Sequence, residues 1–436
     1  MLANNWKQNL HLEPTRGWLN DPNGLAYFNG KYRIFHQYSY EVNGGLKLWY
    51  YYTSSNLKNY EDRGVFLTPT IEEETHGVYS GSANIEDGKL VFYYTGNVKY
   101  QGDYDYVHAG RGHNTISFET EDGINFTEKK CLLTTDDYPN MSNHVRDPKI
   151  FEKNGKKYLV LGARDSNDYG CLLVYDKDTL KLVKTIYSKK NLGFMWECPD
   201  YFEVDGKEIF MFSPQGITRM YPNYENMYQI GYSIVEDGIE NVDKLDNFTL
   251  LDYGHDFYAS QTFLDEDNNR VLIGWMYVPD SSYTNPTTKF GYQNCLTVPR
   301  VVNFKDGKVR QTLHKSVKDL LGNDIETNDF NKNTWYYKQE HGESFEISVA
   351  DFKVSYDNKE LKVSFGTSGY GRKDRKYKLD LEDVEIVFDS SSIELFANGG
   401  SFTISTRFYP ENHDVKILAT NYVAKELGAI EIREEN

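Results

Sequence analysis

The stretch "GLAYFNGKYRIFHQY", Gly24–Tyr38, places the dipeptide Asn29-Gly30 between two hydrophobic runs. Asn-Gly is among the strongest short signals for a type I′ turn, whose twist matches that of two antiparallel strands. The stretch therefore predicts a strand, a tight turn and a second strand, and the question is how often the chain repeats this unit.

The same design recurs along the chain. Four more turns lie between hydrophobic runs, at Asp87-Gly88, Asn154-Gly155, Asp205-Gly206 and Asp267-Asn268. Their spacing of roughly fifty to seventy residues suits one blade of a β-propeller each. Long amphipathic helices are absent up to about residue 310, and five blades of four strands would fill about 300 residues. We therefore expect a five-bladed β-propeller over residues 1–310. Several β-sandwiches are the competing interpretation, but they would show shorter and more even strand spacing.

The remainder of the chain has a different pattern. Leu313–Asp324 is expected to form one short helix in a connector over residues 311–330. Residues 331–436 alternate apolar and polar side chains, which is typical of a half-buried antiparallel sheet. About 105 residues suit a small β-sandwich. The expected fold class is all-β, a propeller followed by a C-terminal β-sandwich that packs beside it and carries no site chemistry of its own.

Charge and cysteine usage limit the partners. A formal net charge of −17 without a dense basic run disfavours nucleic acid and anionic membranes as partners. The first residues lack the apolar core of a signal peptide, and no apolar run reaches transmembrane length. The four cysteines are widely spaced and predict neither a zinc site nor a disulfide framework. We expect a reduced, cytoplasmic protein, with a secreted protein that has lost its leader as the alternative. The sequence leaves the oligomeric state open.

Three of the five repeats carry a carboxylate at one place. Asp21, Asp147 and Glu197 lie eight, seven and eight residues before the turns of the first, third and fourth hairpins. Each is followed, directly or after one residue, by a proline, which marks the start of a strand. The first of them lies in "WLNDPNG", Trp18–Gly24, which has the composition of a turn. Since the first strand of every propeller blade lines the central channel, the three acids are expected to meet at one mouth of it.

The alternative is that each acid only caps a bend by accepting backbone N–H bonds. Three acids at matching positions, one of them a glutamate, favour a shared site instead. Glycoside hydrolysis uses such a set, because one carboxylate attacks or activates water while a protonated one donates to the leaving oxygen. Glu197 is the candidate acid, since glutamate has the higher reference pKa and nearby carboxylates raise it. A third carboxylate can offset positive charge on the sugar. No metal or other cofactor is needed, and the ligand spacing of a metal site is missing.

At this point the sequence resembles a known family. "WLNDPNG", "HVRDPKIF" and "WECPD", in this order, are similar to the three signature motifs of glycoside hydrolase family 32. "VYSGSA", "DYGHDFYASQTF" and "SIELFANGG" extend the resemblance over nearly the whole chain. That family holds invertases, sucrose-6-phosphate hydrolases, inulinases and levanases. The resemblance implies a five-bladed propeller with a β-sandwich, and retaining hydrolysis of terminal β-fructofuranosides in sucrose, sucrose-6-phosphate or short fructo-oligosaccharides.

The resemblance also implies roles for residues. Asp21 would be the nucleophile that forms a fructosyl-enzyme intermediate, Glu197 the acid and then the base, and Asp147 the residue that stabilises the transition state. Arg146 would bind sugar hydroxyls and pair with nearby carboxylates. Cys198 would tune Glu197, or would only fill the core. The other implied substrate-binding residues are Asn20, Gln37, Trp49, Tyr79 and Ser80.

One departure from the family concerns the leaving group. The family usually has Trp-Gly-His where this sequence has Trp49-Tyr50-Tyr51. These residues would border the part of the substrate that is not fructose, so the departure leaves the leaving sugar open; alternatively, Tyr51 only fills the volume of the histidine. No basic cluster can be assigned to a 6-phosphate from the sequence. Five histidines are candidates for the rim of the pocket or for purely structural positions, namely His11, His76, His113, His144 and His255.

Two further functions remain possible from the sequence. One is an inverting five-bladed propeller hydrolase that cuts arabinose- or xylose-based glycans, and the other is a sugar-binding propeller without catalysis. A separation of roughly 5 Å between the carboxyls of Asp21 and Glu197 would indicate retention, whereas a longer gap leaves room for water. The intact set of three acids argues against the loss of catalysis.

Overall fold

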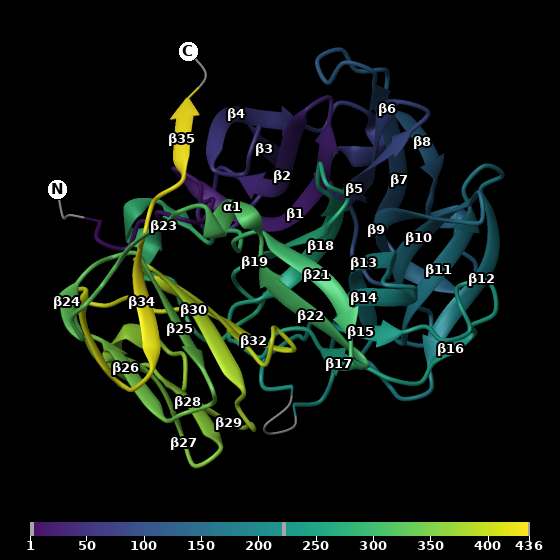
Figure 1. Ribbon diagram of the computed structural model, residues 1–436. Helices are drawn as coiled ribbons and strands as arrows, with labels where there is room; N and C mark the ends of the chain where they lie inside the picture. The colour runs from purple at the N-terminus through teal and green to yellow at the C-terminus, as the bar shows by residue number, and fades with distance from the viewer. Residues whose placement is uncertain (1–3, 220–223, 435–436) are drawn as a thin grey trace.

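The computed structural model describes residues 4–219 and 224–434. Its sheets form the expected five-bladed propeller and a two-sheet sandwich, which confirms the all-β fold class (Figure 1). Each blade is built on four antiparallel strands in chain order. Blades one and two contain β1 (Gly17–Phe28), β2 (Lys31–Ser39), β3 (Leu48–Ser54) and β4 (Asn59–Leu67), then β5 (Val78–Glu86), β6 (Lys89–Lys99), β7 (Arg111–Thr120) and β8 (Lys130–Leu133).

The other three blades repeat the arrangement. Blade three contains β9 (Met141–Lys153), β10 (Lys156–Asp165), β11 (Gly170–Asp176) and β12 (Lys181–Ser188), with the short β16 (Lys244–Leu245) at its edge. Blade four contains β13 (Met195–Val204), β14 (Lys207–Gln215), β15 (Gly231–Ile234) and β17 (Thr249–Leu250). Blade five contains β18 (Tyr258–Leu264), β19 (Arg270–Trp275), β21 (Arg300–Lys305) and β22 (Lys308–Leu313).

The five expected hairpins are all present, between the first and second strands of the five blades. In four of them both turn residues have positive φ, 49–53° for the Asn or Asp and 73–79° for the glycine, as type I′ turns require. The fifth turn is longer, and the Asp265 carboxylate holds it by accepting the backbone N–H groups of Asp267 and Asn269. Local turn chemistry therefore accounts for the innermost hairpin of every blade.

The innermost strand of every blade is interrupted by a β-bulge near the same mouth of the channel. The pairing register shifts at Leu19–Pro22 in β1, at Tyr79–Gly81 in β5, at Glu197–Asp200 in β13 and at Tyr258–Gln261 in β18. In β9 the shift lies opposite Val160–Gly162. A bulge bends the strand and re-aims a side chain, so the five inner strands turn selected residues toward one pocket.

These bulges correct two expectations. The "WLNDPNG" stretch is not a turn but part of the long strand β1, and Asp21 lies in its bulge. The prolines Pro22, Pro148 and Pro199 lie inside strands rather than at their starts. The physical reason is that a bulge leaves a backbone position out of the ladder, where a proline without an N–H group is tolerated.

The sandwich consists of two six-stranded sheets. The first contains β23 (Leu321–Asp324), β34 (Tyr422–Leu427), β25 (Trp335–Glu340), β30 (Asp383–Asp389), β31 (Ser392–Ala397) and β32 (Phe402–Arg407). The second contains β24 (Asp329–Asn331), β33 (Asp414–Ala419), β26 (Phe345–Val349), β27 (Phe352–Asp357), β28 (Glu360–Ser364) and β29 (Arg375–Lys378). A dense core lies between them, in which the Trp335 and Phe388 rings stack at 4.0 Å.

The connector is less helical than the sequence predicted. Helix α1 covers only Lys315–Lys318, with the His314 side chain accepting the N–H of Ser316, and the last residues of the expected helix form β23 instead. A strand pairing with β34 replaces the helix there, so a tertiary contact overrides the local preference.

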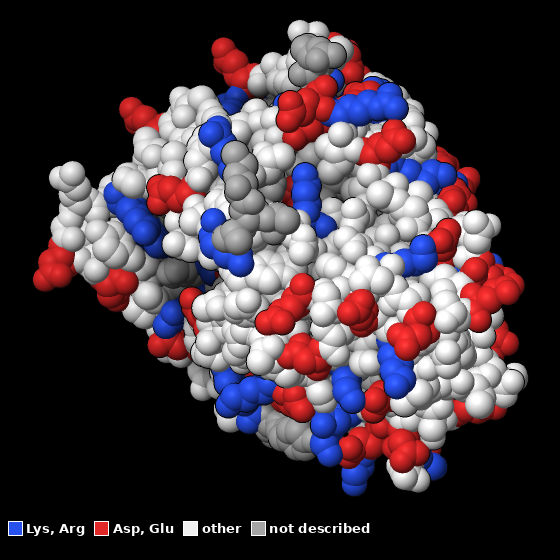
Figure 2. All heavy atoms as spheres, turned by 90° about the vertical axis from the view of Figure 1, so that its left-hand side faces the viewer, with Lys and Arg blue, Asp and Glu red and all other residues white. Residues whose placement is uncertain are grey.

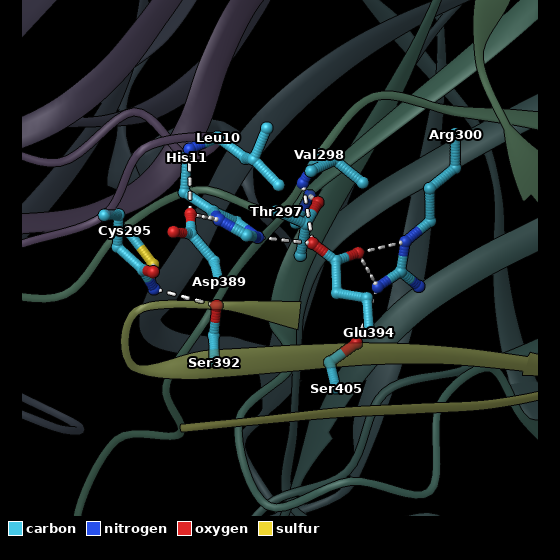
Figure 3. Close-up of polar contacts among 12 residues, drawn as sticks. Leu10, His11, Cys295, Thr297, Val298, Arg300, Asp389, Ser392, Glu394 and Ser405 are labelled. Atoms are coloured by element: carbon cyan, nitrogen blue, oxygen red, sulfur yellow. Dashed lines mark hydrogen bonds and ion pairs between the residues drawn. The ribbon is translucent and has the colours of Figure 1, made fainter. Parts of the chain in front are cut away.

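Both ends of the chain cross between the two parts. The C-terminal strand β35 (Glu431–Glu434) runs parallel to β4 and extends the first blade, and β20 (Tyr292–Gln293) extends it beside β1 (Figure 1). Near the N-terminus, the His11 imidazole bonds two carboxylates of the sandwich, those of Asp389 and Glu394, at 2.8 Å each (Figure 3). The Arg300 guanidinium of the propeller also binds Glu394. A buried polar network therefore joins the propeller to the sandwich.

The surface mixes both charges. On the face in Figure 2, acidic and basic side chains are interspersed, without a large area of one sign. None of the helices in the described ranges has the length and hydropathy that a membrane crossing requires.

Candidate active site

A pocket of about 250 Å³ opens where the bulged inner strands meet. Its size is at the small end of ligand pockets, which suits a single sugar ring better than a long chain. Every blade supplies at least one side chain from its innermost strand. The lining residues are Trp18, Asn20, Asp21, Gln37, Lys47, Tyr79, Ser80, Arg111, Arg146, Asp147, Glu197, Gln215, Tyr258, Trp275 and Pro279.

The three acids that the sequence singled out lie together in this pocket. Asp21 comes from β1, Asp147 from β9 and Glu197 from β13. Asp21 Oδ2 accepts a hydrogen bond from the Ser80 hydroxyl of β5, and Oδ1 accepts one from the Asn20 amide at 3.1 Å. These bonds hold the carboxylate in one orientation and leave it half-buried at the pocket wall.

Glu197 is held by four donors. Its Oε1 accepts Arg146 Nε at 3.2 Å and Nη2 at 2.7 Å. Its Oε2 accepts the Gln215 amide at 2.7 Å and the Tyr258 hydroxyl at 2.8 Å. The carboxylate is therefore fixed in orientation before any sugar enters, and fixed groups of this kind favour catalysis.

Asp147 is the most buried of the three acids, with 3% of its surface exposed. Its Oδ2 accepts the backbone N–H of Cys198 at 2.8 Å and lies 4.0 Å from Arg146 Nε. Burial is the main reason that its pKa rises to about 7; the Arg146 charge opposes the rise, and Glu197 and Asp21 add to it. Its φ of 64° is unusual for a non-glycine residue and is imposed by the bulge.

Arg146 connects the acids. Burial by itself would lower its pKa, but the charges of Glu197 and Asp147 outweigh this and raise it. Its Nη1 donates to His144 Nδ1 at 2.8 Å. Burial and the neighbouring Arg146 and Arg111 charges lower the pKa of His144 to about 3, so this ring is a neutral acceptor that orients Arg146.

The remaining expected substrate-binding residues divide into two groups. Asn20, Gln37, Tyr79 and Ser80 line the pocket, and the Asn20 amide also donates to Gln37. Trp49 and Cys198 do not line it. Trp49 is fully buried behind Tyr79, whose backbone carbonyl accepts its indole N–H at 3.0 Å.

Cys198 is also buried, and its Sγ lies 3.6 Å from Asp21 Oδ2. Burial raises the pKa of this thiol well above its usual value, so the side chain is neutral. Its backbone N–H, rather than its sulfur, makes the shorter contact to a pocket acid.

Tyr50 and Tyr51, which replace the usual Gly-His, do not line the pocket. The Tyr51 ring stacks on Phe35 at 4.8 Å, and Tyr50 stacks on His36 and donates to Asp62 at 2.5 Å. The Tyr51 packing agrees with the alternative that this ring only fills volume, and a contact of either tyrosine with the leaving sugar stays a prediction.

None of the five candidate histidines lines the pocket. His144 supports Arg146, and the buried His113 ring packs against Tyr79 and His144. His11 belongs to the network in Figure 3. His76 lies on the surface, and His255 is buried against Tyr283 and Phe365.

The sequence analysis missed several lining residues. Tyr258 lies in "DYGHDFYASQTF", which matched the family without an assigned role, and Gln215 lies in the short stretch "SPQG" at the end of β14. Lys47 and Arg111 had no signal of their own, because each is a single basic residue within a mixed stretch. Only the packing of blades one and two brings them to the pocket.

Three carboxylates and a bridging arginine at the mouth of a propeller form a site suited to a glycoside hydrolase. The comparisons agree. The glycosyl hydrolases family 32 N-terminal domain matches residues 11–314, and the family's C-terminal domain matches residues 322–433. The chain therefore belongs to glycosyl hydrolase family 32, and the protein is a glycoside hydrolase of the invertase type.

Individual relatives support this assignment. A sucrose-6-phosphate hydrolase of Staphylococcus xylosus is 32% identical over 94% of this chain and 88% of its own. A raffinose invertase of Escherichia coli is 32% identical over 94% of this chain and 90% of its own. The solved sucrose-6-phosphate hydrolase of Lactobacillus gasseri superposes with a TM-score of 0.85 at 27% identity, covering 98% of this chain and 94% of that one. A family 32 β-fructofuranosidase of Bombyx mori gives 0.83 at 26% identity, covering 99% and 96%.

Proposed function

We propose that this protein is a retaining β-fructofuranosidase that releases terminal fructose from sucrose, sucrose-6-phosphate or short fructo-oligosaccharides. The observation that carries the proposal is the meeting of Asp21, Asp147 and Glu197 in one small pocket, with Arg146 binding Glu197 beside Asp147. The names of the relatives and the sucrose complex of the Bombyx mori enzyme support a sucrose-like substrate.

In the proposed first step, an Asp21 carboxylate oxygen attacks the anomeric carbon of the fructosyl unit. The bond from that carbon to the leaving oxygen breaks, and the Glu197 carboxyl donates its proton to this oxygen. In the second step, Glu197 takes a proton from water while the water oxygen attacks the same carbon and Asp21 departs. Two inversions retain the anomeric configuration.

Asp147 and Arg146 are proposed to bind fructose hydroxyls while positive charge develops on the ring. A carboxylate near that charge lowers the barrier because the pocket is shielded from bulk water. Asn20, Gln37 and Ser80 would complete the hydroxyl contacts and keep Asp21 aimed.

The test is hydrolysis across sucrose, sucrose-6-phosphate, kestose, inulin, levan and aryl arabinosides, with the product anomer followed by NMR. We expect β-fructose as the first product from fructosides and no turnover of arabinosides. Asp21→Asn and Glu197→Gln should each reduce turnover by orders of magnitude, whereas Glu346→Gln in the sandwich serves as a matched control without effect. An inverted first product, or unchanged rates in either pocket variant, would refute the mechanism. Sugar binding without turnover by the wild-type protein would favour a binding propeller.

A further inference from the structure

Two cations in the pocket have no anionic partner. Lys47 and Arg111 line the pocket with the three acids, yet neither forms an ion pair with a carboxylate anywhere in residues 4–219 and 224–434. Arg146, the third cation, is fully engaged with Glu197 and His144. A protein of net charge −17 has many acids available, so two unpaired basic groups at one site need an explanation.

Holding Lys47 there costs free energy. Its ammonium lies 5.2 Å from the centre of the Trp18 ring and 3.4 Å from Asn20 Oδ1. Burial lowers its pKa to about 8, and Asp21 offsets this only in part. A cation that is desolvated without a partner gains most from a bound anion.

Arg111 is in a similar position. Its Nη1 donates to His113 Nε2 at 3.3 Å, but its Nε is buried without a hydrogen-bond partner in the described part of the chain. The charged groups that act on it include Arg146, and burial lowers its pKa. It is also paired across the β6–β7 ladder with Lys99, and like charges directly opposite each other destabilise a sheet.

Both cations reach the pocket from the third strands of their blades rather than from the innermost strands. Lys47 directly precedes β3, the third strand of blade one, and Arg111 begins β7, the third strand of blade two. The three acids come from the first strands of their blades, so the two cations reach the pocket from a different set of strands. Tyr79 lies near both, since Val78 N–H donates to the Lys47 carbonyl and the Tyr79 phenol interacts with Arg111.

We propose that Lys47 and Arg111 form a binding site for a phosphate on the leaving sugar, which makes them specificity-determining residues for a phosphorylated disaccharide over the neutral one. This inference rests on the proposed fructofuranosidase function and deepens it. A dianionic phosphate in the pocket would accept hydrogen bonds from the Lys47 ammonium and from the Arg111 guanidinium. The sequence could not reveal this site, because each residue is a single cation within a mixed stretch and only the packing of blades one and two brings them together.

The test compares kcat/KM for sucrose-6-phosphate and sucrose in the wild-type protein, Lys47→Met, Arg111→Met and the control Lys353→Met. Lys353 is a sandwich residue paired with Glu346. We expect a wild-type preference for the phosphorylated substrate, which each pocket variant reduces by about tenfold to a hundredfold, since a hydrogen bond to a charged group is worth about that much. Lys47→Arg should restore part of the preference, and Lys353→Met should keep it.

Equal loss on both substrates, or no wild-type preference, would overturn the phosphate site while leaving the fructofuranosidase proposal intact. If the wild-type protein hydrolyses neither substrate, the proposed function itself is wrong. A measurement on wild-type protein alone covers variants that fail to fold: glucose-6-phosphate should inhibit sucrose hydrolysis at least about tenfold more strongly than glucose. Equal inhibition by the two sugars would also overturn the site.

Discussion

Replacing His11 with glutamine should remove a pH-dependent part of the protein's stability. The His11 ring is buried and both of its nitrogens bond carboxylates, Nδ1 to Asp389 and Nε2 to Glu394, each at 2.8 Å (Figure 3). Both nitrogens must therefore carry protons, which describes an imidazolium. Burial by itself would lower the pKa of His11, but the hydrogen bonds and charges of the two acids outweigh it and raise the pKa from 6.5 to about 9.

The magnitude follows from this shift. A group whose pKa is higher in the folded than in the unfolded state stabilises the fold fully below the unfolded value and loses this effect as pH rises through the folded value. For His11 the loss runs from pH 6.5 to about pH 9 and amounts to about 3 kcal/mol of unfolding free energy. Below this range, His11→Gln should cost about 3–5 kcal/mol, because it leaves the buried Asp389 carboxylate without a cation and removes one of the two cations of Glu394, which keeps Arg300.

The assay is urea unfolding of the wild-type protein and His11→Gln at several pH values across this range. Other groups titrate in both proteins, so their effects cancel in the difference between the two unfolding free energies. The surface variant His76→Gln is the control and should follow the wild-type protein. If the difference between wild type and His11→Gln stays constant over the range, His11 is not an imidazolium and the reasoning is refuted.

Three other substitutions test the site and the bulges that form it. Asp147→Asn should abolish most turnover but raise the melting temperature above pH 7. Burial raises the pKa of this carboxyl to about 7, so its ionised form costs stability above that pH. Melting curves should show this gain disappear toward pH 3.8, and a gain that is independent of pH would contradict the assignment. His144→Phe removes the acceptor of the Arg146 Nη1 hydrogen bond and should lower kcat/KM for fructosides by about tenfold to a hundredfold in steady-state kinetics. Unchanged kinetics would show that Arg146 keeps its orientation without this hydrogen bond. Gly81→Ala would place a Cβ 2.0 Å from the Tyr93 carbonyl oxygen, so urea unfolding should show a loss of about 1–3 kcal/mol, and a stability equal to the wild type would mean that the bulge adapts freely.

Much of the architecture was predictable because its signals are local. A type I′ turn depends on two adjacent residues such as Asn29-Gly30, and four such turns with a fifth, longer one at blade spacing predicted the propeller. Asp21, Asp147 and Glu197 could be selected because they occupy one position in a repeated unit. The resemblance to family 32 came from the short motifs around the same residues.

Other features were misjudged because several residues in contact decide them. The composition of "WLNDPNG" is that of a turn, but pairing with β2 keeps it in a bulged strand. Trp49 was expected to touch substrate, yet it packs in the core behind Tyr79. Tyr51 fills space within blade one, which the sequence offered only as one of two alternatives.

The sequence by itself therefore determined the all-β class, the number of blades and the identity of the three pocket acids. Only the tertiary structure decided which partners hold those acids and that His11 lies between two carboxylates of the sandwich. It also decided that Lys47 and Arg111 reach the same pocket without forming an ion pair within residues 4–219 and 224–434. The physical reason is range: turns and strand patterns depend on neighbours along the chain, whereas ion pairs and desolvated charges depend on which distant strands pack together.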